Sequence, residues 1–252
     1  MGLALGDLFP REDRNGQPRP RGGGLTVDKL ARAKGLPADF VRQFCEPAGR
    51  AVRIVYRLAN GERAPRQRLR TALKAKGGSR WEPARGPKPV PYGLERMGDA
   101  RQAGYLVLVE GETDCWTLWY HGFPALGIPG ASMAGTLAGE YLEGISRLYV
   151  WQEPDKGGEA FVRGVARRLA AIGWSGRALV VRITGVKDPN ELHQRNPGAF
   201  AQAFREALER AEPLAFDEDE EDSAGPQEPQ DEGPEPPGGR PGAEHLTDLG
   251  NA

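Results

Sequence analysis

Three short apolar runs, each followed by acidic residues and then by glycine or proline, constrain the fold of this chain more than any other feature. They lie in the segments LVLVEGETD, LYVWQEPDKGG and VVRITGVKDPNEL, and each is typical of a buried strand that ends in a turn. Strands are expected at about 105–109, 123–128, 147–151 and 178–183, with helices near 113–121, 134–145, 158–172 and 198–211. Such an alternation of strand and helix indicates an α/β fold with a parallel sheet.

The acidic residues after these runs are expected at the edge of the sheet where ligands bind. Glu110 and Asp114 follow the first run, Glu153 and Asp155 the second, and Asp188 the third. In an open parallel sheet, ligands bind at the carboxyl ends of the strands. Carboxylates that meet there repel one another unless a cation lies between them, and oxygen ligands suit Mg²⁺ or Mn²⁺. The pattern therefore favours phosphoryl-transfer chemistry on nucleotides or nucleic acid.

The three motifs together resemble those of the toprim fold. VEGETD resembles the first, glutamate-bearing toprim motif, EPDKGG the second, and KDPNEL the third acidic turn of primases. The chain is similar to toprim-domain primases of the bacterial DnaG-like, phage and mobile-element type. The resemblance covers about residues 25–212 and is strongest over 105–192. It implies a toprim domain, a Rossmann-like parallel sheet flanked by helices.

The resemblance also implies roles for individual residues. Metal ligands would be Glu110, Glu153, Asp155 and Asp188, with Glu110 and Asp155 catalytic. Asp114 and Asn190 would support the site, and Lys156 and Lys187 would bind phosphate. The chain departs from the family where Glu153 replaces the usual aspartate and where Asn190 stands in place of a frequent second acid. Without metal, the acidic pair would simply favour a helix N-terminus, and Asn190 could cap a helix at NELHQR.

Composition divides the chain into four parts. Residues 1–24 are predicted to form a flexible arm, 25–101 a small basic α+β subdomain, 102–212 the toprim domain, and 213–252 a disordered, acidic, proline-rich tail. Residues 215–252 contain 12 acidic residues and six prolines, too polar a composition to bury a core. Within the subdomain, two short helices are expected after Leu25, and Asn60-Gly61 predicts a hairpin turn.

The subdomain carries an excess of positive charge. Residues 50–101 hold 14 Lys or Arg against four Asp or Glu, a net charge of +10. This favours contact with the nucleic-acid backbone over a merely solvated surface. The candidate nucleic-acid-binding residues are Arg53, Arg57, Arg66, Arg68, Arg70, Lys74, Lys76 and Arg80. Trp81 and Tyr92 could stack on bases or belong to the core.

Composition also argues against several classes of protein. Two cysteines, Cys45 and Cys115, cannot form a C-x₂-C zinc site or a disulfide framework, so no zinc is expected. No signal peptide and no membrane-spanning apolar run is recognisable, and a cytoplasmic location is expected. No P-loop motif for a helicase motor is present.

The resemblance implies a DNA primase-like nucleotidyltransferase that makes RNA primers on single-stranded DNA during replication of a mobile element or phage. Its partners would be the template, ribonucleoside triphosphates and a replicative helicase on a separate chain, with no membrane. Two alternatives stay open at this point. One is a toprim nuclease or topoisomerase-like cleaving enzyme, and the other is a non-catalytic nucleic-acid-binding accessory protein with a degenerate acidic site.

Overall fold

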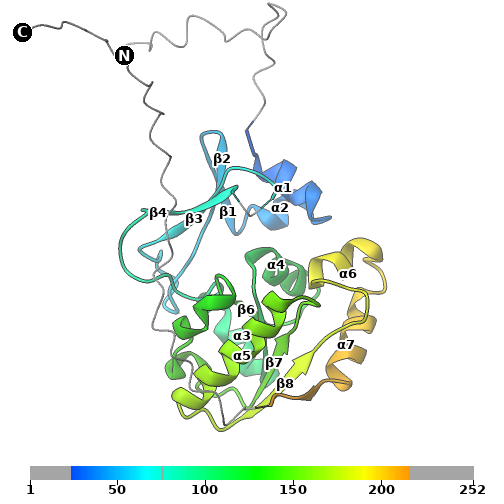
Figure 1. Cartoon of the computed structure of the whole chain (residues 1–252). Helices are drawn as coiled ribbons and strands as arrows, with labels where there is room; N and C mark the ends of the chain where they lie inside the picture. Colours follow the sequence, from blue (N-terminus) through cyan, green and yellow to red (C-terminus); the bar gives the residue numbers. More distant parts are fainter. Residues whose placement is uncertain (1–23, 75–76, 216–252) are drawn as a thin grey trace, which may run out of the picture. The chain divides into compact units, whose positions relative to one another are not determined.

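The computed structural model describes residues 24–74 and 77–215 of the chain. It has the expected α/β class, with a four-stranded antiparallel sheet followed by a five-stranded sheet that is parallel except at one edge (Figure 1). The strand orders are β1-β2-β3-β4 and β6-β5-β7-β8-β9. The arm predicted for 1–24 and the tail predicted for 213–252 lie almost wholly outside the described residues.

The N-terminal part combines two short helices with the antiparallel sheet. Its elements are α1 (Val27–Ala33), α2 (Ala38–Val41), β1 (Cys45–Ala48), β2 (Ala51–Ile54), β3 (Gln67–Arg70) and β4 (Ser79–Glu82). Thr26 caps α1, since its side chain accepts a hydrogen bond from the Lys29 amide. The connection between β2 and β3 turns at Asn60-Gly61, where Gly61 adopts a φ of +84°. The expected hairpin is therefore present, although regular pairing is confined to its outer ends.

The second part is built on the five-stranded sheet. Its strands are β5 (Tyr105–Val109), β6 (Ala125–Gly127), β7 (Arg147–Trp151), β8 (Arg177–Val181) and β9 (Glu212–Pro213). Its α-helices are α3 (Met97–Ala103), α4 (Glu112–Tyr120), α5 (Lys156–Ala171), α6 (Pro189–Arg195) and α7 (Phe200–Glu209), and its 3-10 helices are η2 (Leu94–Arg96), η3 (Ala131–Thr136) and η4 (Gly139–Leu142). None of these helices combines the length and apolarity that crossing a bilayer requires.

Both faces of the parallel sheet are buried, which explains why its strands are continuous apolar runs. In β5, Val107 and Val109 face the core shared with α4, α7 and the N-terminal part. Leu106 and Leu108 face the other core, shared with α3 and α5. Side chains alternate between the two faces of a strand, so the strand must be apolar on both sides.

The N-terminal part packs against α4 through aromatic rings. Phe44 lies against Trp116 with ring centroids 6.4 Å apart and against Trp119 at 5.0 Å. The Trp116 indole N–H donates to the hydroxyl of Tyr92, which is 1% exposed. Tyr92 therefore belongs to the core. The alternative prediction, that its ring stacks on bases, is wrong because the ring is buried.

Three sequence-based boundaries need correction. The helix expected near 134–145 is replaced by η3 and η4, because three glycines interrupt the segment and Gly144 takes a left-handed φ of +76°. The elements η2 and α3, which begin before residue 102, pack in the core of the parallel sheet. Beyond residue 212, β9 pairs with β8 and Leu214 is buried, so the ordered sheet extends past the predicted end.

The packing of α5 yields a direct test of this architecture. Phe161 is fully buried against the sheet, whereas Arg163 lies on the exposed side of the same helix. Phe161→Ala should lower the free energy of unfolding by about 3–5 kcal/mol, because it leaves a cavity in the core. Arg163→Ala should change it by less than about 0.5 kcal/mol. Urea denaturation of the two variants measures this difference, and equal effects would contradict the assigned face.

Candidate active site

The three acidic segments meet at the carboxyl edge of the parallel sheet. β5, β7 and β8 are adjacent and parallel, so their carboxyl ends lie together. Glu110 directly follows β5, Glu153 and Asp155 follow β7, and Asp188 lies beyond β8. The charges of both acids after β7 act on Glu110, and the charge of Asp188 acts on Glu153. The fold thus brings the segments together as the strand pattern predicts.

Glu110 lies at this edge in an environment that disfavours its ionised form. Burial, and then the nearby charges of Glu153 and Asp155, raise the pKa of its carboxyl from 4.5 to about 7. One oxygen, Oε1, is buried and accepts no hydrogen bond. A buried acceptor without a partner is costly, so this atom is suited to a ligand that supplies positive charge or a proton.

Glu153 forms an ion pair with a lysine. Its carboxylate and that of Asp155 do not converge on a shared metal position. Its Oε2 lies 3.2 Å from the ammonium nitrogen of Lys187, and its side chain is 16% exposed. Burial raises the pKa of Glu153, and the charge of Lys187 opposes that rise. The same ion pair raises the pKa of Lys187. Lys187 therefore supplies positive charge to the acidic edge, whereas Lys156 is exposed at the start of α5.

Two of the predicted metal ligands act as helix N-caps. Asp155 Oδ1 accepts a hydrogen bond of 3.0 Å from the Gly158 amide at the start of α5. Asp188 Oδ1 accepts one of 2.7 Å from the Glu191 amide at the start of α6. Capping uses one oxygen of each carboxylate and fixes where the side chain lies. Asp188, and not Asn190, therefore caps the helix that begins at Pro189.

Asp114 and Asn190 form a buried layer beneath the edge. Asp114 is 7% exposed, and burial followed by the charge of Asp188 raises its pKa well above the usual range. The backbone N–H of Asn190 donates to Asp114 Oδ1 at 3.4 Å. The Asn190 side chain is 1% exposed and makes hydrogen bonds within the protein. These contacts show a supporting position for both residues, with Asn190 turned away from the solvent edge.

The donor chemistry fits a hard divalent cation. The edge offers carboxylate oxygens from three strand ends, including the unpartnered Oε1 of Glu110, and such oxygens suit Mg²⁺ or Mn²⁺. Within residues 24–74 and 77–215, no three His, Cys, Asp or Glu side chains converge on one point closely enough to hold a metal ion. Binding would therefore require these carboxylates to move closer together.

Most of the predicted nucleic-acid-binding arginines make contacts inside the subdomain. Arg53 pairs with Glu46 at 2.9 Å and Glu82 at 2.6 Å, and Arg70 is only 5% exposed. Arg57 and Arg66 donate to backbone carbonyls. These contacts leave Arg70 in particular unable to reach a phosphate, which corrects its assignment. Lys76 lies outside the described residues.

Four exposed cations lie on β4, on the loop before it and on the segment after it. Lys74, Arg80, Arg85 and Lys88 are exposed and form no ion pair within the described residues. Trp81, on β4, is partly exposed, and the guanidinium groups of Arg66 and Arg68 lie 5.6 and 4.8 Å from its ring centre. Trp81 therefore keeps the partly exposed ring that contact with nucleic-acid bases would require.

A contact between the subdomain and the acidic edge was missed from the sequence. The Tyr56 hydroxyl donates to Glu112 Oε1 at 2.7 Å, and Arg68 Nε lies 4.0 Å from the same oxygen. Glu112 is the first residue of α4, two positions after Glu110. No local pattern identifies this pair, because the partners are 56 residues apart in the chain.

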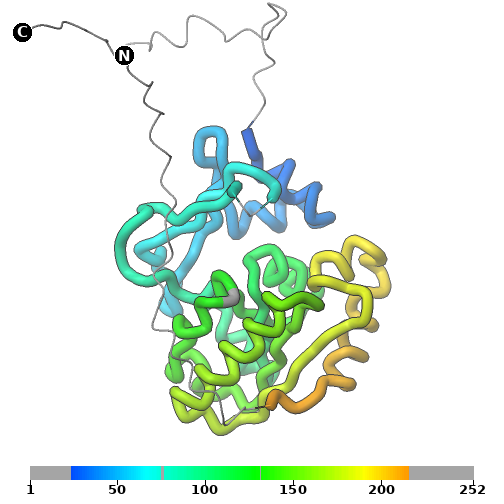
Figure 2. The backbone as a smooth tube through the Cα atoms, viewed as in Figure 1, coloured from blue at the N-terminus to red at the C-terminus, as the bar shows by residue number. Residues whose placement is uncertain are grey.

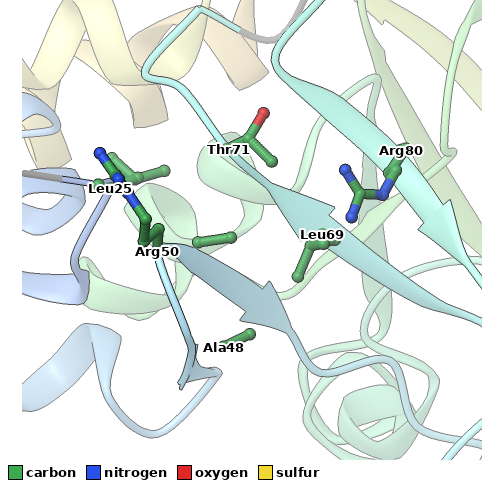
Figure 3. A pocket seen from close by; sticks show the side chains of 8 residues that line it. Leu25, Ala48, Arg50, Leu69, Thr71 and Arg80 are labelled. Carbon is green, nitrogen blue, oxygen red and sulfur yellow. The ribbon is translucent and has the colours of Figure 1, made fainter. Parts of the chain in front are cut away.

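The antiparallel sheet also carries an open pocket. A cavity of about 570 Å³ is lined by Gly24, Leu25, Ala48, Arg50, Ala51, Leu69, Thr71 and Arg80 (Figure 3). Strand alternation places Leu69 and Arg80 on the sheet face opposite Arg68 and Trp81. The cavity therefore opens away from the face that contacts Glu112, and it is separate from the acidic edge.

Comparison with known structures identifies the fold. The structure of the DnaG catalytic core matches with a TM-score of 0.58 and 16% identity over 75% of this chain and 73% of that one. The DnaG primase catalytic domain bound to ssDNA matches with a TM-score of 0.54 and 19% identity over 74% and 63%. The E. coli primase catalytic core matches with 0.53 and 17% over 74% and 65%.

The chain has the fold of a DnaG primase catalytic core. It spans less than two thirds of the length of two of those three structures. No protein-family model matches the chain, and no curated protein matches it in sequence. At this level of identity the likeness concerns the fold, and the chemistry has to be argued from the residues of the acidic edge.

The raised pKa of Glu110 predicts a pH-dependent effect of its removal. Between about pH 4.5 and 7, the folded protein keeps a proton on Glu110 that the unfolded chain releases, so this group's contribution to stability falls as pH rises through that window. Glu110→Gln should therefore melt at a higher temperature than wild type at pH 8, and at nearly the same temperature at pH 5. Glu209→Gln, at an exposed position of α7, should show no such gap. Thermal melts of all three proteins across pH 5–8 test the prediction, and a gap that does not change with pH would refute it.

Proposed function

We propose that this protein is a primase-like toprim nucleotidyltransferase that joins ribonucleotides on a single-stranded DNA template with the help of a divalent cation. The observation that supports it most is the convergence of Glu110, Glu153, Asp155 and Asp188 on one sheet edge, with a buried carboxylate oxygen of Glu110 lacking a partner. One of the structures with the same fold is a DnaG primase catalytic domain bound to ssDNA.

The proposal assigns chemistry to the residues of the edge. Mg²⁺ or Mn²⁺, held by Glu110, Glu153, Asp155 and Asp188, would lower the charge on the reacting phosphate. Without a metal, Glu110 has a pKa of about 7 and can hold a proton near neutral pH, which a cation bound beside it would displace. Lys187, already beside Glu153, can exchange this carboxylate for a phosphate oxygen of the incoming nucleotide. We further propose that the protein acts during replication of a mobile element or phage, together with a replicative helicase encoded on a separate chain.

One observation favours a second function, a non-catalytic nucleic-acid-binding protein. The ion pair between Lys187 and Glu153 partly neutralises the acidic edge without a metal. If the ion pair persists in the presence of divalent cations, the acidic edge would have a structural role and would not bind a catalytic metal. Metal binding therefore separates the two functions.

Metal should stabilise the folded protein if the proposal is correct. A cation that binds only the folded state at about 100 times its dissociation constant adds about 2.7 kcal/mol, or a rise of roughly 5–10 °C in melting temperature for a chain of this size. Asp155→Asn should remove most of this rise while still capping α5, because asparagine caps helices as well as aspartate. Glu159→Gln, which removes a charge within the first turn of the same helix, is the matched control.

The same variants should be assayed for primer synthesis on single-stranded DNA with labelled ribonucleotides. Wild type and Glu159→Gln should extend primers in Mg²⁺ or Mn²⁺, and Asp155→Asn should be at least about 100-fold slower, on the scale of losing an electrostatic catalytic group. A wild type whose melting temperature ignores both ions, and which makes no primers, would support the non-catalytic function. Cleavage of the template would instead indicate a nuclease.

The exposed cations predict how DNA binding depends on salt. Each contact with single-stranded DNA contributes about −0.7 to the slope of log affinity against log salt. Replacing Arg80, Arg85 and Lys88 together by alanine should therefore make the slope shallower by about 2. Replacing Arg147, Arg163 and Arg177, which are exposed outside the basic stretch, should leave it unchanged. Fluorescence anisotropy over a salt series measures both, and equal slopes would exclude these contacts.

A further inference from the structure

The helix that Asp188 caps, α6, is joined to the end of α1 by two side chains. Asn190 and His193, three positions apart in α6, lie on the same side of that helix. Asn190 Nδ2 donates to the Lys34 carbonyl at 2.9 Å, and His193 Nε2 lies 2.8 Å from the Gly35 carbonyl. The end of α1 and α6 lie side by side although they are far apart in the chain (Figure 2). Two carbonyl groups left open at the end of α1 are satisfied in this way.

We call the contacts of Asn190 and His193 with the Lys34 and Gly35 carbonyls the junction. Its hydrogen bonds require a side-chain amide at position 190. The Lys34 carbonyl can only accept a hydrogen bond, and the Thr117 hydroxyl already donates to the Thr113 carbonyl at 3.0 Å. Asn190 Nδ2 donates to both Lys34 O and Thr117 Oγ1, each at 2.9 Å. Its Oδ1 accepts from Gln194 at 2.6 Å. An ionised aspartate offers no donor, and would place its charge against a carbonyl oxygen in a buried position.

The histidine of the junction is fixed by the same reasoning. The Gly35 carbonyl accepts, so His193 Nε2 carries the hydrogen, and in that tautomer Nδ1 is the acceptor. His121 Nε2 then donates to His193 Nδ1 at 2.9 Å. Gly35 adopts a φ of +66°, and a Cβ there would lie 3.3 Å from His193 Nε2. The junction therefore joins α1, α4 and α6.

The position of α6 in turn decides where two residues of the acidic edge lie. Asp188 caps α6, and the backbone amide of Lys187 donates to Glu191 Oε2 in its first turn at 2.7 Å. A hollow of about 400 Å³ beside the junction is lined by Lys34, Lys187, Asp188, Asn190, Glu191, Gln194 and Arg195. A displacement of α6 would move Asp188 and Lys187 together.

We infer that Asn190 is a positioning residue, whose amide couples the end of α1 to α6 and so sets the geometry of Asp188 and Lys187 at the acidic edge. This inference rests on the proposed metal-dependent function for its catalytic meaning. On this view, asparagine at position 190 is not a decayed metal ligand, because its side chain is committed to Lys34 and Thr117.

Hydrogen exchange of the metal-free protein tests the coupling by itself. Asn190→Asp should speed exchange of the Glu191 and Leu192 amides in α6 and of the Leu36 amide beyond α1, each by about 10-fold or more, because both sides lose the shared contact. Asn196→Asp adds the same charge at an exposed position, where the side chain still accepts from the Ala199 amide, and should change neither segment. Faster exchange in α6 alone, or in neither segment, would overturn the coupling. If Asn190→Asp does not fold, Asn190→Ser, which loses one of the two donated bonds, takes its place.

Mn²⁺ binding, measured by electron paramagnetic resonance at a temperature where each variant is folded, tests the consequence for the site. Asn190→Asp or Asn190→Ser should raise the half-saturating Mn²⁺ concentration at least threefold, and Asn196→Asp should not. Wild-type binding with unchanged half-saturation in the Asn190 variants would show a merely structural role. A wild type that binds no Mn²⁺ would refute the proposed function, while the exchange experiment would still decide whether Asn190 couples the two helices.

Discussion

Burial of both faces of the parallel sheet is the constraint on which the rest of the structure depends. Helices α3 and α5 on one side, and α4, α7 and the N-terminal part on the other, require strands whose central residues are apolar on both faces. Charged residues are therefore confined to the ends of these strands. Arginines begin β7 and β8, and acidic residues follow the carboxyl ends of β5, β7 and β8. Because these strands are parallel neighbours, their ends bring Glu110, Glu153 and Asp188 to one edge. The acidic site is a consequence of how the sheet is buried.

Crowding of carboxylates at this edge is destabilising, and several contacts within the protein offset the repulsion. Burial and neighbouring charge raise the pKa values of Glu110 and Asp114, which favours their neutral forms. Lys187 pairs with Glu153, and Asp155 and Asp188 each accept a backbone hydrogen bond at a helix start. Under the proposed function, a cation bound at this edge would remove the repulsion that remains, since a nearby positive charge favours the ionised carboxylates.

The N-terminal part contributes more to the architecture than its charge suggests. Several of its arginines satisfy carboxylates and carbonyls within the subdomain, which leaves a smaller set of cations on and around β4 for an external polyanion. Contacts of Tyr56 with Glu112, and of Lys34 with Asn190, connect this part to α4 and α6. Positive charge counted along a sequence therefore overestimates the positive charge that a ligand meets.

The sequence by itself determined the α/β class, the order of the main strands and the three acidic turns, because burial and strand periodicity are local properties of the chain. It also located the turn at Asn60-Gly61, where Gly61 takes a left-handed φ. Only the tertiary structure decided that Arg70 is buried and that Asp188 rather than Asn190 caps α6. It also decided that the Asn190 side chain donates a hydrogen bond to the Lys34 carbonyl. Those outcomes depend on partners far away in the chain, whose distance and orientation no local pattern encodes.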